Sequence, residues 1–82
     1  MEIQVLFFAR ARELAGTDSA RVELAAEAHV TDALAQVAAN YPALGKYLAN
    51  CRTAVDEEFV TTDAPLAENS VLAIIPPVSG GL

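Results

Sequence analysis

The sequence predicts a small α+β domain in which one main helix crosses a mixed β-sheet. Three observations predict this fold. Short segments with strand-like alternation occupy both halves of the chain, and a single long amphipathic segment lies between them at residues 32–41. An almost continuous apolar run at residues 71–75 is typical of a central strand covered on both sides. With 82 residues, the chain has the length of one domain.

The first part of the chain predicts two strands that pair antiparallel. Residues 2–8 alternate, and one face of this strand carries apolar side chains that we assign to the core, Ile3, Val5 and Phe7. The opposite face carries Gln4, Leu6 and Phe8. Good helix formers follow at residues 9–15 and end before Gly16, because glycine commonly terminates a helix. Residues 20–24 alternate again and predict the second strand.

The main helix is expected at residues 32–41. Thr31 has a side chain suited to the N-cap, and Asp32 lies in the first turn, where the helix dipole favours an anion. Apolar residues recur at helical spacing along one face, Leu34, Val37, Ala38 and Tyr41. Pro42 disfavours helical geometry at the residue before it and is expected to end the helix.

The remaining segments predict a hairpin and a last strand. Residues 53–55 and 59–61 flank Asp56-Glu57-Glu58, which is typical of a turn, and the apolar run forms the last strand. The predicted element order is β-β-α-β-β-β, which matches the β-grasp, or ubiquitin-like, architecture. We expect a β-grasp domain at residues 1–75 and an extended C-terminal tail at residues 76–82.

Composition and charge exclude several classes of function. The formal net charge is −6, so the chain would repel the phosphate backbone of a nucleic acid. No apolar run approaches the roughly 20 residues of a membrane-spanning helix. The N-terminus has no basic signal-peptide region, which favours a cytoplasmic protein. A single cysteine, Cys51, permits no internal disulfide, and His29 has no second ligand at metal-binding spacing.

The C-terminal tail combines stiffness with a bare tip. Pro76 and Pro77 cannot donate hydrogen bonds to a sheet and hold the chain extended, and Gly80 and Gly81 then remove the side chains. A frayed terminus would also be rich in glycine. A stiff stalk with a bare tip is nevertheless suited to entering a narrow channel of another protein. A chain too short for a pocket of its own is expected to be a carrier, subunit or binding module.

Two longer motifs lie at the two ends of the chain. They are VLFFARARELAGT at residues 5–17 and PPVSGG at residues 76–81, with Ala54-Val55 and Pro65-Leu66 between them. Together these segments resemble the family of small, sulfur-carrying subunits of molybdopterin synthase, and the resemblance covers essentially the whole chain.

The resemblance implies a sulfur carrier that is not an enzyme on its own. In this family, an activating enzyme of the ubiquitin type uses ATP to adenylate the C-terminal glycine carboxylate. A sulfur donor protein then displaces AMP and leaves a thiocarboxylate. The tail enters the large synthase subunit and gives its sulfur to cyclic pyranopterin monophosphate. The resemblance places this chemistry on Gly81, preceded by Gly80, with no bound cofactor or metal in this chain and a heterotetrameric synthase.

A partner-binding surface is expected on the sheet face that a single helix leaves uncovered. The resemblance points to Phe8, Phe59 and Ile75 as the contact with both the large subunit and the activating enzyme. The tail adds the residues that would enter the partner, Pro76, Pro77, Val78 and Ser79. Cys51 is expected to be a small, partly buried apolar residue that takes no part in sulfur transfer.

Leu82 departs from the family pattern, which ends at the second glycine. The Gly81 carbonyl is then part of an amide and cannot be adenylated. Leu82 is a cloning or tag scar, is trimmed before activation, or marks a chain inactive in sulfur transfer, and we favour the first interpretation. Two other functions stay open. One is another double-glycine sulfur carrier, of the thiamine or cysteine pathway, and the other is a ubiquitin-like modifier joined to lysine side chains.

Overall fold

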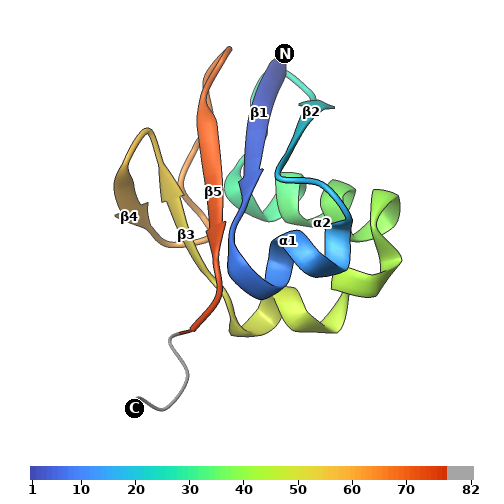
Figure 1. Ribbon diagram of the computed structural model, residues 1–82. Helices are drawn as coiled ribbons and strands as arrows, with labels where there is room; N and C mark the ends of the chain where they lie inside the picture. The colour runs from blue at the N-terminus through green and yellow to red at the C-terminus, as the bar shows by residue number, and fades with distance from the viewer. Residues whose placement is uncertain (78–82) are drawn as a thin grey trace.

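The computed structural model describes residues 1–77, which form a five-stranded sheet, two α-helices and two short 3-10 helices (Figure 1). In chain order the elements are β1 (Glu2–Phe7), α1 (Ala9–Ala15), β2 (Ser19–Glu23), α2 (Val30–Asn40), η1 (Pro42–Leu44), η2 (Lys46–Asn50), β3 (Arg52–Val55), β4 (Glu58–Val60) and β5 (Val71–Ile75). The predicted order of strands and main helix is confirmed. Their predicted bounds differ from the observed ones by at most two residues.

The sheet is mixed, and β5 lies at its centre. The strand order is β2-β1-β5-β3-β4. Strands β1 and β5 are parallel, and every other neighbouring pair is antiparallel. The first and last strands of the chain are therefore neighbours, and Phe7 aligns with Ile74. This topology confirms the predicted β-grasp sheet.

All the helices contribute to one core on one face of the sheet (Figure 1). Their buried side chains are Ala11, Val30, Ala33, Val37, Leu44 and Leu48. They pack against buried strand residues, among them Ile3, Val5, Phe7, Leu72 and Ile74. The core face predicted for the first strand is confirmed. None of the helices in residues 1–77 has the length and apolar character needed to cross a membrane.

The expectation that the central strand is covered on both sides is wrong for the part of the chain described. Along β5, Leu72 and Ile74 are fully buried against the helices. The alternate residues Val71, Ala73 and Ile75 are partly exposed on the opposite face. The run is continuously apolar because both faces of β5 carry apolar side chains. The helices cover only one of these faces, and no element of residues 1–77 covers the other.

The main helix begins earlier than predicted. Its N-cap is His29, and the proposed cap Thr31 lies inside the first turn, where its hydroxyl donates to the Thr62 carbonyl at 2.8 Å. Asp32 occupies the third helical position, and its carboxylate accepts a hydrogen bond from the His29 backbone N–H at 2.8 Å. An acid at this position satisfies a backbone donor at the start of the helix. The buried stripe correspondingly starts at Val30.

Candidate functional site

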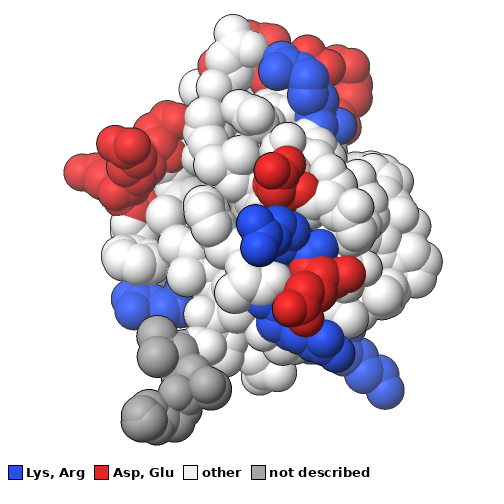
Figure 2. All heavy atoms as spheres, viewed as in Figure 1, with Lys and Arg blue, Asp and Glu red and all other residues white. Residues whose placement is uncertain are grey.

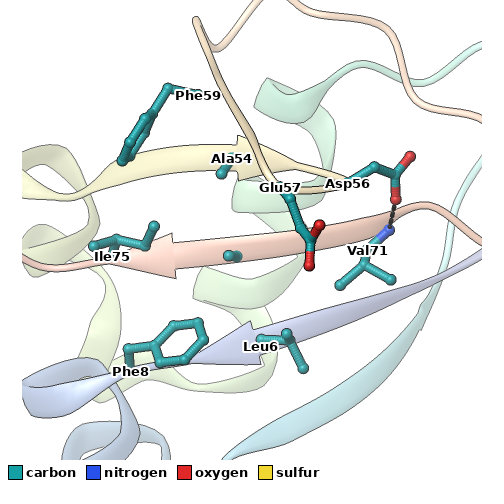
Figure 3. A pocket seen from close by; sticks show the side chains of 9 residues that line it. Leu6, Phe8, Ala54, Asp56, Glu57, Phe59, Val71 and Ile75 are labelled. Carbon is teal, nitrogen blue, oxygen red and sulfur yellow. Dashed lines mark hydrogen bonds between the residues drawn. The ribbon is translucent and has the colours of Figure 1, made fainter.

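An open apolar groove lies on the sheet face opposite the helices (Figure 3). It has a volume of about 500 Å³. Its lining comes from four strands, β1, β3, β4 and β5, from the residue that joins β1 to α1, and from the turn between β3 and β4. The lining residues are Leu6, Phe8, Ala54, Asp56, Glu57, Phe59, Val71, Ala73 and Ile75. The three apolar contact residues predicted from the sequence are all in this set.

Strand register explains the shape of the groove. Leu6 of β1 aligns with Ala73 of β5, which aligns with Ala54 of β3, which in turn aligns with Phe59 of β4. Aligned residues of neighbouring strands point to the same face of a sheet. Two alanines therefore form the floor, and the larger side chains of Leu6 and Phe59 stand on either side of it (Figure 3).

The position of Phe8 depends on the backbone between β1 and α1. Phe8 is extended, with φ −118° and ψ 152°, so it continues the alternation of β1 by one residue. Phe8 thus shares the face of Leu6, and the residue is 46% exposed. Ala9 then adopts a positive φ of 49° and turns the chain into α1.

Phe59 is more exposed than Phe8, the other aromatic residue of the groove, and its exposed fraction is 60%. The guanidinium carbon of Arg52 lies 4.2 Å from the centroid of the Phe59 ring. A cation over an aromatic face is attracted by the electron density of the ring. The contact therefore favours the position of Phe59 at one side of the groove.

The acidic residues of the lining belong to the tight turn between β3 and β4. Asp56 and Glu57 both have positive φ values, 50° and 75°. The Asp56 carboxylate accepts a hydrogen bond from the Val71 backbone N–H at 3.0 Å, and the Asp56 N–H donates to the Val71 carbonyl at 2.9 Å. These two bonds hold the turn against the start of β5 (Figure 3).

The tail leaves the sheet beside the aromatic part of the groove. Ile75 is the last residue of β5 and belongs to the lining. Pro76 is buried, whereas Pro77 is exposed. The other tail residues to which we assigned a role, Val78, Ser79, Gly80 and Gly81, lie outside the described residues together with Leu82.

Six of the lining residues were not predicted from the sequence as part of the contact surface. They are Leu6, Ala54, Asp56, Glu57, Val71 and Ala73. The alternation of β5 contained part of the missing signal. Successive side chains of a strand point to opposite faces, so a core position for Leu72 and Ile74 places their neighbours on the other face. Val71 and Ala73 must then share that face with Ile75, which was predicted as a contact residue. For the acidic pair, the sequence predicts only a turn.

Two other side chains considered for chemistry lie away from the groove. The Cys51 thiol is partly buried beside the core and donates to the Tyr47 carbonyl at 3.5 Å. Desolvation raises the pKa of this thiol, which disfavours the thiolate. His29 caps α2 and forms an isolated bridge with Pro65. Among residues 1–77, no group of three or more His, Cys, Asp or Glu side chains is placed to hold a metal ion.

Comparisons with known proteins agree with this fold. Residues 5–81 match the ThiS family. The molybdopterin synthase sulfur carrier subunit of Chlamydomonas reinhardtii is 42% identical, over 99% of this chain and 100% of that protein. The crystal structure of SAMP1 from Haloferax volcanii is similar with a TM-score of 0.92 and 28% identity, over 99% of this chain and 100% of that one.

A further solved structure contains a similar fold within a complex. It is the protein–protein complex of subunits 1 and 2 of the molybdopterin-converting factor from Helicobacter pylori. One of its chains matches with a TM-score of 0.72 and 22% identity, over 99% of this chain and 100% of that one. From the family match and the full-length relatives, the chain belongs to the ThiS family of β-grasp proteins, together with the sulfur carrier subunits of molybdopterin synthase.

Proposed function

We propose that this chain is a sulfur carrier in molybdenum cofactor biosynthesis and acts as the small subunit of a molybdopterin synthase. The observation that carries the proposal is the exposed apolar groove, which extends to Ile75, the residue at which β5 leads into the double-glycine tail. A full-length relative with 42% identity bears the name of this subunit. The chain is not an enzyme on its own in this proposal, since the groove serves to bind a partner.

The proposed chemistry takes place at the C-terminus. In a chain that ends at Gly81, the terminal carboxylate attacks the α-phosphorus of ATP on an activating enzyme and releases pyrophosphate. A sulfur nucleophile at the oxidation level of sulfide, supplied by a donor protein, attacks the acyl carbon, and AMP leaves. The product is a thiocarboxylate. Glycine suits both steps because it leaves the carbonyl unhindered. Two deliveries to cyclic pyranopterin monophosphate supply the dithiolene sulfurs.

The proposed partner for the groove is the large subunit of the synthase. The exposed aromatic rings of Phe8 and Phe59 form an apolar surface of the kind that partner proteins cover. The Helicobacter pylori complex joins two subunits of a molybdopterin-converting factor, one of which has this fold. Docking through the groove would place Ile75, the last residue of β5, against the partner.

The test compares two versions of the chain, one ending at Gly81 and one ending at Leu82. Each is incubated with ATP, the activating enzyme and the sulfur donor, and its intact mass is measured. The chain ending at Gly81 should gain the mass difference between sulfur and oxygen, whereas the chain ending at Leu82 should stay unchanged unless it is first trimmed. A thiocarboxylate formed with Leu82 still in place would overturn the assignment to Gly81.

An assay with the same thiocarboxylated chain shows which biosynthetic pathway receives its sulfur. With the large subunit and cyclic pyranopterin monophosphate it should yield molybdopterin. A carrier of the thiamine or cysteine pathway would form the same thiocarboxylate and yield none.

A second candidate function is that of a protein modifier. The observation in its favour is the likeness to SAMP1, which is named a small archaeal modifier protein. In this case the activated Gly81 would be joined to lysine amines instead of receiving sulfur. Expression of the tagged chain ending at Gly81 in its own cells discriminates the two. A ladder of covalent conjugates supports the modifier, and co-purification of a large synthase subunit without a ladder supports the carrier.

A further inference from the structure

Opposite charges flank the apolar groove at its two ends. At the end where β5 finishes, Arg52 of β3 aligns with Ile75 and lies over the Phe59 ring. At the other end, Asp56 and Glu57 contribute to the lining. Arg52 and Asp56 are four positions apart, which corresponds to roughly 13 Å along an extended strand. The charges thus lie far enough apart to contact different groups of a bound protein.

The charge of Arg52 is available to a partner. Within residues 1–77 the ion pairs are Arg10 with Glu13 and Arg21 with Glu2, and neither includes Arg52. Its guanidinium is instead held by the face of the Phe59 ring. Stacking leaves the edge of a guanidinium, with its N–H donors, free to bind a carboxylate. The structure therefore places this cation beside the Phe59 ring, at the end of the groove where β5 finishes.

At the acidic end, the backbone of the turn is tied to β5. The hydrogen bonds between Asp56 and Val71 hold the turn against β5, and the side chain of Glu57 extends over the floor of the groove (Figure 3). Acidic side chains gather over the turn between β3 and β4 on the molecular surface (Figure 2). The chain has a net charge of −6, so the basic end of the groove differs in sign from the protein as a whole.

We propose that this polarity fixes the direction in which the large synthase subunit docks. The proposal rests on the proposed function and adds the chemistry of the partner surface. That surface is an apolar patch with a carboxylate opposite Arg52 and a basic side chain opposite Asp56 and Glu57. A partner rotated by half a turn would face each charge with a like charge, which is unfavourable when the charges are desolvated. One orientation is favoured, and it places the end of β5 against a defined part of the partner.

A charge swap tests the proposal, with binding of the large subunit from the same organism as the readout. Arg52→Glu and Glu57→Arg should each weaken binding by roughly tenfold at low ionic strength, mainly through slower association. The double variant Arg52→Glu/Glu57→Arg keeps the net charge of the chain but reverses the groove. It should bind at least as weakly as either single variant.

Matched controls separate polarity from net charge. Lys46→Glu and Glu27→Arg make the same changes of charge at exposed positions outside the groove, and both should bind within about twofold of the unaltered chain. Arg52→Met keeps an apolar stem next to Phe59 and removes the charge. It should bind more weakly than the unaltered chain and lose part of the salt dependence.

The outcomes distinguish a failure of the proposed docking direction from a failure of the proposed function. If the double variant binds as tightly as the unaltered chain, net charge decides and the polarity is refuted. The same follows if Phe59→Asp abolishes binding while Arg52→Glu and Arg52→Met leave affinity and salt dependence unchanged. If the unaltered chain does not bind the large subunit at all, the proposed function fails, and the docking direction fails with it.

Discussion

Phe7 and Phe8 are consecutive in the chain, yet their rings lie on opposite faces of the sheet. Phe7 is 1% exposed and meets Tyr41 edge to face, with ring centroids 5.4 Å apart and planes inclined at 70°. Phe8 lines the groove on the other face. One ring therefore stabilises the domain, and the other is free to contact a partner.

The two phenylalanines should respond differently to truncation. Phe7→Ala removes a buried ring and its contact with Tyr41, and should lower the free energy of unfolding by about 3–5 kcal/mol. In an 82-residue domain, that is a large part of the total stability. Phe8→Ala should cost about 1 kcal/mol or less. Urea titration followed by circular dichroism measures both, and equal losses would contradict the assignment of the two faces.

Phe59→Asp should weaken binding of the large subunit and leave the domain folded. The ring is largely exposed, so its removal costs the fold little beyond the contact with Arg52, whereas a charge on the apolar groove must be desolvated on binding. We expect a loss of about 2 kcal/mol or more in binding, which is roughly 30-fold in Kd. Calorimetric titration measures it. Phe59→Leu is the control and should retain most of the affinity; an unfolded Phe59→Asp chain would show that the ring belongs to the core.

The turn between β3 and β4 should be stabilised by glycine at its second position. Glu57 has a φ of 75°, a conformation that is unfavourable for a residue with a side chain and free of strain for glycine. Glu57→Gly should raise the free energy of unfolding by about 1 kcal/mol, or Tm by about 4–8 °C. Glu58→Gly, one residue later in the extended strand β4, is the matched control and should lower stability. The reverse order of the two would contradict the turn geometry.

The ion pair between β1 and β2 should make stability depend on acid. Arg21 donates to the Glu2 carboxylate at 2.9 Å, and this hydrogen bond lowers the pKa of Glu2 below its ordinary value of 4.5. The contribution of the pair is thus present above the ordinary pKa and is lost as the pH falls through the lowered value. Glu2→Gln should reduce the urea midpoint at neutral pH and have little effect at about pH 2. The pair is exposed, so an effect that persists in acid would need another cause.

Cys51→Ala should retain sulfur transfer. The raised pKa of the thiol keeps it protonated at neutral pH, and its side chain packs beside the core instead of the groove. Mass spectrometry of the activated chain ending at Gly81 should find the added sulfur in the C-terminal peptide and none on Cys51. Loss of the thiocarboxylate in a folded Cys51→Ala chain would place a sulfur-relay step on this residue.

The local structure of this protein could be predicted from short stretches of its sequence. Alternation in β1 assigned Phe7 to the core and Phe8 to the opposite face, and their burial confirms it. The role of Gly80 and Gly81 stays a prediction, because they lie outside the described residues. These signals could be interpreted because strand and helix periodicity are properties of a few neighbouring residues. The start of α2 was placed two residues late because Asp32 caps the helix from its third position.

The composition of the groove was decided by tertiary structure. Phe8 and Ile75 are 67 positions apart in the numbering and become neighbours because β1 pairs in parallel with β5, with Phe7 aligned to Ile74. Arg52 reaches the Phe59 ring because the hairpin register aligns Ala54 with Phe59. Such pairings depend on how the whole chain packs around one core, since a strand can satisfy its hydrogen bonds with more than one neighbour. The sequence therefore predicted an exposed apolar face, whereas its alanine floor and its oppositely charged ends required the assembled sheet.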